Sequence, residues 1–150
     1  MRIIVGGESR KSGKTTVVCR ILGAFPDAGW TVVKISPHMH TGSESGWSFE
    51  EDSNAGDTLR YRKAGARRTF LYCGPTGPGL QALLDVLSAE RNWIVETTAA
   101  GQLIPHDLAI LVAAPAGVEP KNIPSGFPPH VRLDASDPTL ESLVLSRWKS

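Results

Sequence analysis

The sequence predicts an α/β fold, a three-layer sandwich in which helices cover both faces of a mostly parallel central sheet. Short runs rich in β-branched residues alternate along the chain with segments that show helical periodicity. Several of these runs are continuously apolar, as expected for strands that are buried on both faces. The chain has 150 residues, enough for one substantial core, so we expect residues 1–150 to form a single domain.

The first half of the chain alternates strands and helices. Helical spacing of apolar residues predicts a helix over residues 14–25 and a second one over residues 57–65, which Gly65 ends. Residues 36–56 are polar and rich in glycine and serine, so we expect a long loop there, and loops of that length are usually functional or mobile. Apolar runs predict strands at residues 2–5, 30–35 and 67–73.

The second half continues the alternation and then becomes irregular. A turn is expected at residues 74–79, followed by a helix over 80–90 whose leucines recur at i, i+3, i+4 and i+7. Residues 114–129 contain five prolines and are not expected to form a regular element. The last helix is expected over 139–148, with Asp137 as its N-cap. Apolar runs predict strands at residues 93–97 and 107–114 and a short one at 130–134.

The composition argues against partners that are captured by bulk charge or by a long apolar segment. The formal net charge is +1, with 21% charged and 41% hydrophobic residues, so no large basic surface for nucleic acid is expected. No apolar run approaches the roughly 20 residues of a membrane helix. The start of the chain becomes glycine-rich too soon for a signal peptide. We therefore expect a cytoplasmic protein with no nucleic acid and no membrane among its partners.

The segment GGESRKSGKTTVV at residues 6–18 has the character of a phosphate-binding loop. The common pattern is G-x-x-x-x-G-K-[ST], placed after a strand and before a helix. Residues 13–15 supply its second half, but Glu8 stands where the first glycine belongs, and Gly7 lies one place earlier. The strand–loop–helix context is retained, so we favour a phosphate loop over an ordinary glycine-rich turn that carries a surface lysine.

Each position of such a loop has a chemical task. Backbone N–H groups and the N-terminus of the following helix attract phosphate charge, and Gly13 lets the backbone approach without a Cβ. Lys14 would contact the β- and γ-phosphates, the Thr15 hydroxyl would ligate Mg²⁺, and Thr16 could contact the α-phosphate. The other nucleotide-binding residues are expected to be Gly7 and the crown of the loop, Ser9, Arg10, Lys11 and Ser12.

Three further stretches, VVKISPHMH, GDTLRYRKAGA and WIVETTA, follow the glycine-rich start in that order. With it, they make the first two thirds of the chain resemble the family of molybdopterin-guanine dinucleotide biosynthesis protein B (MobB), within the P-loop NTPase superfamily. The match consists of a strand that ends in a lysine before a histidine-containing loop, a helix that begins with Asp-Thr and closes on Ala-Gly-Ala, and a strand that ends in glutamate. In this chain the matching residues are Lys34, His38, His40, Asp57, Thr58, residues 62–66 and Glu96.

The resemblance implies a function. Members of the family bind GTP with Mg²⁺, hydrolyse it slowly at best, tend to dimerise, and are thought to assist the enzyme that attaches GMP to molybdopterin. For this chain it implies GTP or ATP as ligand, a homodimer, and a molybdenum-cofactor nucleotidyltransferase as partner. The chain departs from the pattern in three places. Glu8 stands where many P-loops have glycine, Thr97 stands where the family usually has glycine, and the C-terminal third is short and proline-rich. The G-x5-G-K-T spacing also resembles dethiobiotin synthetase, an ATP-dependent ligase.

Two acids are candidates for the metal and for catalysis. Glu96 ends an apolar run, at the place where P-loop proteins keep a carboxylate that holds Mg²⁺ or orients the attacking water. We favour this role over a solvent-facing acid, because open α/β sheets bind ligands at the carboxyl ends of their strands. Asp57 is by itself a first-turn acid that the helix dipole stabilises, and its metal role comes from the resemblance. The expected metal ligands are thus Thr15, Asp57 and Glu96, and the expected catalytic residues are Lys14 and Glu96.

Other charged groups are weaker candidates. Asp107 opens a strand and is expected at the opposite edge of the sheet. His38 and His40 lack a convincingly spaced third ligand, which favours exposed or hydrogen-bonded imidazoles over a metal pair. No Asn-Lys-x-Asp signature for guanine occurs, so the base is inferred from the resemblance alone. A basic cluster around the second helix is more often a solvated face than a site for an anionic substrate; it comprises Arg60, Arg62, Lys63, Arg67 and Arg68.

Three functions therefore compete at this point. The first is a Mg²⁺-dependent nucleotide-binding accessory protein, with GTP favoured and at most weak hydrolysis, in molybdenum cofactor biosynthesis. The second is an ATP-dependent ligase or kinase that resembles dethiobiotin synthetase, although a nucleotide kinase should carry an arginine-rich lid. The third is an interaction domain with a degenerate loop, whose thermal stability nucleotides would leave unchanged.

Overall fold

In the part of the chain that the structure describes, seven strands form one mixed sheet in the order β3-β4-β2-β5-β1-β6-β7. The computed structural model describes residues 1–37, 46–51, 56–121, 123, 127 and 130–150. Within this part of the chain, β3 pairs antiparallel with β4, and the other pairings are parallel. The strands are β1 (Arg2–Gly7), β2 (Thr31–Ser36), β3 (Ser48–Glu51), β4 (Arg68–Cys73), β5 (Trp93–Glu96), β6 (Leu108–Val112) and β7 (Val131–Leu133).

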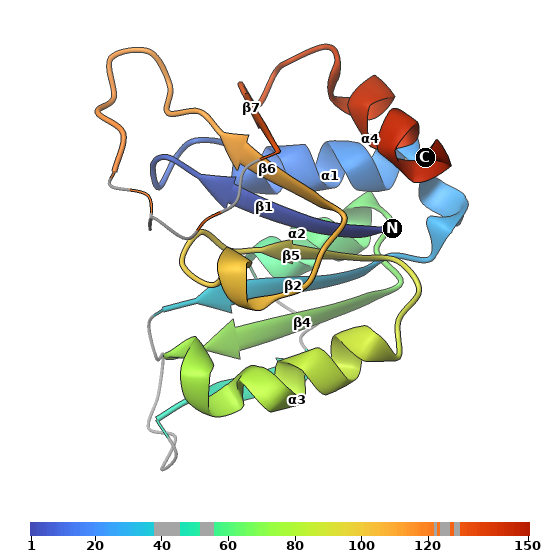
Figure 1. Ribbon diagram of the computed structural model, residues 1–150, viewed down its shortest axis with the longest axis vertical. Coiled ribbons are helices and arrows are strands. Elements are labelled where there is room, and N and C mark those ends of the chain that lie inside the picture. The colour runs from blue at the N-terminus through green and yellow to red at the C-terminus, as the bar shows by residue number, and fades with distance from the viewer. Residues whose placement is uncertain (38–45, 52–55, 122, 124–126, 128–129) are drawn as a thin grey trace.

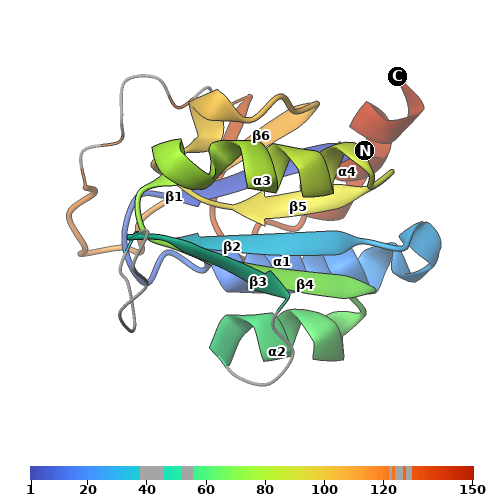
Figure 2. The ribbon, with the colours of Figure 1, turned by 90° about the horizontal axis from the view of Figure 1, so that it is seen from below.

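Helices flank both faces of this sheet, so the expected α/β fold class is confirmed. In Figure 2, α3 lies on one side of the strands, and α1 and α2 lie on the other. None of the helices in the described ranges has the length and apolar character that crossing a bilayer requires. The helices are α1 (Lys14–Ala24), α2 (Gly56–Ala64), α3 (Thr76–Ser88) and α4 (Leu140–Lys149), with 3₁₀ turns at Pro26–Ala28 and Gly101–Leu103.

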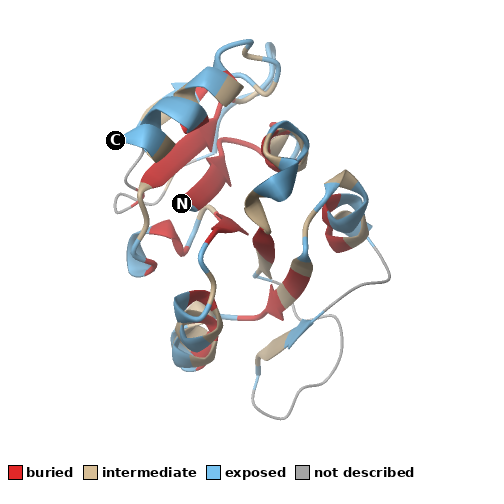
Figure 3. Cartoon of the chain, turned by 90° about the vertical axis from the view of Figure 1, so that its right-hand side faces the viewer, coloured by how far each residue is buried: buried red, intermediate tan, exposed pale blue. Residues whose placement is uncertain are grey.

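Alternate residues of the central strands supply two separate cores. In β1, Ile3 and Val5 pack under α1, α2 and α4, whereas Ile4 faces α3 on the other side. All three side chains are fully buried, and each buried aliphatic side chain of this size contributes about 1.5–3 kcal/mol. Figure 3 shows the result: the central strands are mostly buried, and the outer faces of the helices are largely exposed. The continuous apolar runs in the sequence reflect this burial on both faces.

The strand order creates a point of divergence beside β1. From β1 the chain passes through α1 to β2, which lies beyond β5, whereas β6 lies on the other side of β1. In open α/β sheets, ligands bind outside the carboxyl ends of the strands at such a point. Figure 1 shows that β1, β2 and β5 end on the same side of the molecule, where α1 begins.

Two expected elements near β4, at the β3 edge of the sheet, differ from the structure. Residues 48–51, expected as loop, form the edge strand β3, because Phe49 stacks on Phe70 of β4 at 5.2 Å and the backbones pair. The turn expected at residues 74–79 is wrong from Thr76 onward, because α3 begins there with Pro75 as its N-cap. Pro78 is tolerated so early in the helix because its missing N–H falls among those that lack an intrahelical acceptor.

The start of the last helix also differs. Asp137 was expected as its N-cap, but the N-cap is Thr139 and α4 begins at Leu140. The Asp137 carboxylate accepts hydrogen bonds from the backbone N–H and the hydroxyl of Thr139. This local turn satisfies the aspartate before the helix starts.

Candidate functional site

The predicted phosphate loop connects β1 to the N-terminus of α1. Gly13 is the N-cap of α1 and adopts a φ of 97°, in the left-handed region that glycine tolerates. A Cβ on Gly7 would lie 2.2 Å from Ser12 Oγ and 2.8 Å from the Lys14 side chain. The absence of a side chain at Gly7 thus lets the Lys14 stem lie directly against the start of the loop.

A cavity of about 740 Å³ opens at this edge of the sheet. Beyond the loop, the ends of β2 and β5, the turn after β4 and the N-terminal parts of α2 and α3 contribute to its wall. Ser12, within the loop, is buried and does not line the cavity. The other predicted nucleotide-binding residues all line it: Gly7, Ser9, Arg10, Lys11, Gly13, Lys14, Thr15 and Thr16.

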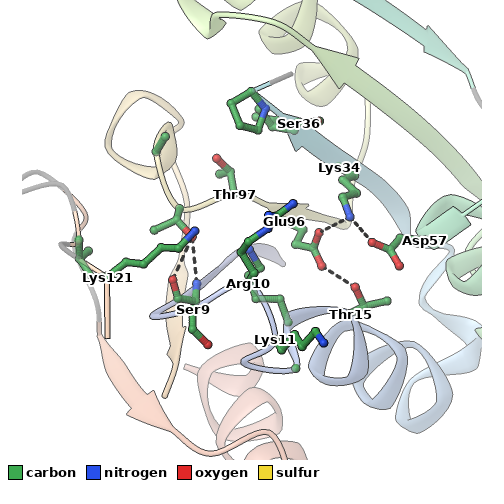
Figure 4. Close-up of a pocket in the computed structure, with 18 of the residues that line it drawn as sticks. Ser9, Arg10, Lys11, Thr15, Lys34, Ser36, Asp57, Glu96, Thr97 and Lys121 are labelled. Atoms are coloured by element: carbon green, nitrogen blue, oxygen red, sulfur yellow. Dashed lines mark hydrogen bonds and ion pairs between the residues drawn. The ribbon is translucent and has the colours of Figure 1, made fainter. Parts of the chain in front are cut away.

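Three elements bring the predicted metal and catalytic residues together (Figure 4). The Thr15 hydroxyl, in the first turn of α1, donates to Glu96 Oε1 at 2.9 Å. Lys34, near the end of β2, donates to Asp57 of α2, and its Nζ lies 3.5 Å from Glu96 Oε2. Glu96 is only 3% exposed, so the Lys34 ammonium compensates a buried charge. Arg60, whose side chain is largely exposed, also pairs with Asp57, with 3.8 Å between Arg60 Nη1 and Asp57 Oδ1.

Lys14 and Lys34, two of the four described lysines that line the cavity, have opposite electrostatic environments. Burial, followed by the charges of Lys34 and Lys121, lowers the pKa of Lys14, although Glu96 acts against this. Burial also acts to lower the pKa of Lys34, but the Glu96 charge and the Asp57 hydrogen bond outweigh it and raise that pKa overall. Lys34 is thus a charge-satisfied ammonium, whereas the Lys14 ammonium is destabilised in the protein alone and would gain from an anion.

Two hydroxyls in the loop are buried without a hydrogen-bond partner in the described structure. They are Ser9 Oγ and Ser12 Oγ, in residues that are 7% and 4% exposed. An unsatisfied buried hydroxyl costs about 1–3 kcal/mol, and folded proteins rarely keep one without a reason. Ser9 lines the cavity, but its Oγ is itself buried and does not face open space in this structure.

Tyr61 of α2 is a buried neighbour of the carboxylate. It is fully buried, and burial together with the Glu96 charge raises the pKa of its phenol. The phenol therefore stays neutral beside Glu96. Buried surroundings of this kind strengthen the electrostatic interactions of Glu96.

Glu8, the departure from the common loop pattern, fastens the loop to the rest of the fold. Its carboxylate accepts two hydrogen bonds from Arg132 of β7, at 2.8 and 3.0 Å, and one from the Ala114 N–H at 3.0 Å. Its backbone N–H donates to Val112 of β6, and its carbonyl oxygen accepts from the Lys121 N–H. The residue does not line the cavity. Glu8 therefore has a structural task that a glycine there could not perform.

We expect Glu8 to make the thermal stability of the protein depend on pH in the acidic range. The Arg132 guanidinium, followed by the Ala114 N–H, lowers the pKa of Glu8 from its usual 4.5. Its contribution is therefore complete above about pH 4.5 and is lost as the pH falls through the lower folded-state value. We expect Glu8→Gln to lower the Tm at pH 7 and the difference from wild type to shrink towards pH 3. Thermal melts of both proteins from pH 7 to pH 3 measure this, and a constant difference would contradict it.

The weaker sequence candidates lie elsewhere or are engaged. Asp107 forms a two-pronged pair with Arg2 at the opposite edge of the sheet, as expected. Arg67 and Arg68 precede or begin β4 and pair with Glu90, so the basic cluster does not act as a unit around the cavity. Arg60 is the member that lines it. The expectations for His38 and His40 concern positions outside the described residues.

Sequence reasoning gave Lys34 a place in the family match but no role, and it missed Lys121. Lys34 lines the cavity because β2 delivers it to the carboxyl edge, beside Glu96 of the neighbouring strand. Its position near the end of an apolar strand is the signal that could have drawn attention to it. A partly buried ammonium group there has to be compensated by a nearby carboxylate. Lys121 reaches the cavity from the proline-rich segment after β6, and no local pattern marks it.

The donor atoms in the cavity fit Mg²⁺, and they are too few to enclose it. The Thr15 hydroxyl and the carboxylates of Asp57 and Glu96 are the oxygen ligands that Mg²⁺ prefers. Both carboxylates face one point, which the Lys34 ammonium holds in this structure. No group of three or more histidine, cysteine or acidic side chains in the described ranges could hold a metal. Phosphate and water oxygens would therefore have to complete the coordination.

Some of the residues behind the family resemblance meet at this cavity, whereas Thr58 and residues 62–66, which are also described, do not line it. Lys34, Asp57 and Glu96 line it together with the loop. The same cavity is the place where the strand order predicts a ligand. Comparison of the chain with protein-family models, with curated proteins and with solved structures gave no match, so the function has to be argued from this geometry.

Proposed function

We propose that the chain is a Mg²⁺-dependent nucleoside triphosphate-binding protein of the P-loop type, with at most weak hydrolysis. The observation that carries the proposal is the contact between Thr15, in the first turn after the loop, and Glu96, at the end of a neighbouring strand. This contact joins a loop suited to phosphate with a carboxylate suited to the metal, over one cavity. GTP as the preferred nucleotide comes from the family resemblance alone.

The proposed binding uses the chemistry of each residue. The Lys14 ammonium, the loop N–H groups and the α1 N-terminus neutralise phosphate charge. Bound Mg²⁺ would supply further charge neutralisation, held by oxygens of Thr15, Asp57 and Glu96. The Thr15 hydroxyl donates its hydrogen to Glu96, which leaves its lone pairs available to a cation.

Weak hydrolysis follows from how the acids of the cavity are engaged. Asp57 and Glu96 are the acids among the described lining residues. Both contact Lys34, and Glu96 also accepts from Thr15. A carboxylate held by two donors is a poor acceptor for a proton from water, so a strong general base is not at hand.

One observation favours the second candidate, an ATP-dependent ligase or kinase. The cavity continues beyond the phosphate loop to the end of β2 and to the start of α3, where Ser36, Pro37 and Thr76 line it. This extension offers space for a second small substrate beside the nucleotide. The homodimer and the partnership with a molybdenum-cofactor nucleotidyltransferase are carried by the resemblance alone.

A thermal-shift comparison tests the proposal. We expect GTP or ATP with Mg²⁺ to raise the Tm by roughly 5–10 °C at about 100 times the Kd, since such binding adds about 2.7 kcal/mol. Diphosphates and magnesium-free samples should give smaller shifts, because fewer charges reach the loop and the carboxylates. Stabilisation by GTP alone favours the accessory role. ATP-selective stabilisation favours the ligase or kinase, and no shift at millimolar nucleotide would overturn the proposal.

A further inference from the structure

A cation from a distant part of the sequence shares the cavity with the phosphate loop. Lys121 lies in the irregular segment between β6 and β7, and Figure 4 shows its side chain extended toward the loop. Its backbone N–H donates to the Glu8 carbonyl oxygen at 2.6 Å, which holds the base of this side chain against the loop. The contact spans more than one hundred residues of sequence.

We propose that Lys121 binds the phosphate chain of the nucleotide and that Glu8 positions it there. The inference rests on the nucleotide-binding function proposed above and adds to it a cation from outside the loop motif. The ligand class is a polyphosphate, because an ammonium donates charge-assisted hydrogen bonds to phosphate oxygens as a mobile point charge.

The charges that line the cavity fall into two groups. Lys34 and Arg60 are paired with carboxylates. The second group has no carboxylate partner among the described residues and comprises Arg10, Lys11, Lys14 and Lys121. Unpaired like charges around one cavity repel each other, and an anion between them relieves that repulsion. Lys121 therefore belongs with the loop rather than with the metal ligands.

Lys14 and Lys121 come from distant parts of the sequence and line the same cavity. A phosphate chain that lies on Lys14 is therefore within the field of Lys121 as well.

Glu8 supplies the geometric reason why Lys121 can be held in place. One residue joins the loop to β6 through its N–H, to Lys121 through its carbonyl oxygen, and to β7 through its carboxylate. Among the described residues 113–121, the segment after β6 contains no helix or strand. Ordering a free lysine side chain on binding costs conformational entropy. Because the Lys121 backbone is already fixed, less of this entropy is lost when the ligand binds.

Calorimetric titration of Lys121→Met tests the phosphate contact. The ligands are inorganic tripolyphosphate, GTP and ATP, each with Mg²⁺. We expect the variant to bind all three about tenfold more weakly, the value for one exposed charge-assisted hydrogen bond. Lys121→Arg should retain most of the affinity. Lys149→Met removes the same charge from an exposed position at the end of α4, outside the cavity, and should bind as wild type does.

The outcomes separate this inference from the proposed function. Wild type that binds triphosphate, with Lys121→Met binding equally well, would overturn the role of Lys121 and leave the nucleotide site standing. A loss for GTP and ATP without a loss for tripolyphosphate would assign Lys121 to the base or ribose and overturn the phosphate contact. If wild type binds none of the ligands, both proposals fall.

A double-mutant cycle tests the positioning role of Glu8. We expect Glu8→Gln to weaken tripolyphosphate binding about fivefold in the wild-type background and to have little further effect when Lys121 is methionine. A purely structural effect on the loop would be equally large in both backgrounds and would overturn the positioning role. Arg132→Met removes the same anchor from outside the cavity and should reproduce the pattern, since Arg132 is 59% exposed and does not line the cavity.

Discussion

Replacing Lys14 with alanine should remove the nucleotide response and leave the fold intact. We expect the affinity for a Mg²⁺-bound triphosphate to fall about a hundredfold or more, because charge-assisted hydrogen bonds are worth about 1.5–3 kcal/mol each. In a thermal-shift experiment the stabilisation by GTP or ATP should then disappear at concentrations that saturate wild type.

The stability of Lys14→Ala without nucleotide distinguishes a binding residue from a structural one. Burial is the first cause that lowers the pKa of Lys14, so its charged form is disfavoured in the folded protein alone. Removing it should leave the free energy of unfolding unchanged or slightly higher. A structural lysine, such as one in an ion pair, would give the opposite sign.

Lys11→Ala is the matched control for this experiment. Lys11 is an exposed lysine three residues earlier in the same loop, and it also lines the cavity. Its loss should weaken binding by less than tenfold, because an exposed ammonium contributes about 0.5–1 kcal/mol or less. Equal losses for the two variants would reduce the role of Lys14 to bulk charge, and an unchanged response in Lys14→Ala would remove the basis for the phosphate loop.

The sequence predicts the fold class and the central strands because both depend on local patterns. β1, β2 and β5 are short apolar runs, and the α1 helix has a clear apolar face with Val17, Val18, Ile21 and Leu22 buried. The loop between β1 and α1 could also be located, since Gly13, Lys14 and Thr15 are consecutive in the sequence and follow a short strand. Burial on two faces and helical periodicity are both properties of neighbouring residues.

Other features depend on pairing between distant residues and leave little trace in the sequence. The strand β3 has four residues, two of them glutamates, and it exists through its pairing with β4. The role of Glu8 requires Arg132, which lies more than one hundred residues away. In the sequence, Glu8 is therefore only a departure from the loop pattern. In the structure, its hydrogen bonds with Arg132 make it an anchor of the loop.

The same limit applies within the cavity. Glu96 and Asp57 could be selected as acids at the right ends of their elements. That Lys34 joins them follows from the placement of β2 beside β5, which the order of elements along the chain does not reveal. Strand order across a sheet is decided by packing of the whole domain, so the ionic contacts at its edge become visible only in three dimensions.

Lys34→Met should cause the largest loss of stability among the cavity residues. The variant keeps the unbranched stem and removes the ammonium that compensates Glu96, which is 3% exposed. Breaking a buried pair from one side costs about 3–5 kcal/mol, and because Lys34 and Asp57 are 29% and 26% exposed we expect about 2 kcal/mol. For a chain of this size that lowers the Tm by roughly 4–8 °C.

The pH dependence of this loss has a defined sign. The pKa of Lys34 is raised in the folded protein, so its contribution is complete below the unfolded-state value of about 10.4 and is lost as the pH rises through the folded value. The difference in unfolding free energy between wild type and Lys34→Met should stay constant from pH 7 to pH 10 and shrink above that. Denaturant titrations at pH 7, 9 and 11 measure it. A difference that already fades near pH 8 would show that Lys34 does not hold the carboxylates as a charged group.

Magnesium should reverse part of this loss if the two carboxylates form the metal site. Lys34→Met leaves Asp57 and Glu96 close together with less positive charge between them, so millimolar Mg²⁺ without nucleotide should raise its Tm more than that of wild type. Adding Glu96→Gln removes the buried charge, and we expect this double variant to regain stability and to lose the magnesium response. An equal response of all three proteins would place the bound ion elsewhere, because the three proteins differ only at Lys34 of β2 and Glu96 of β5.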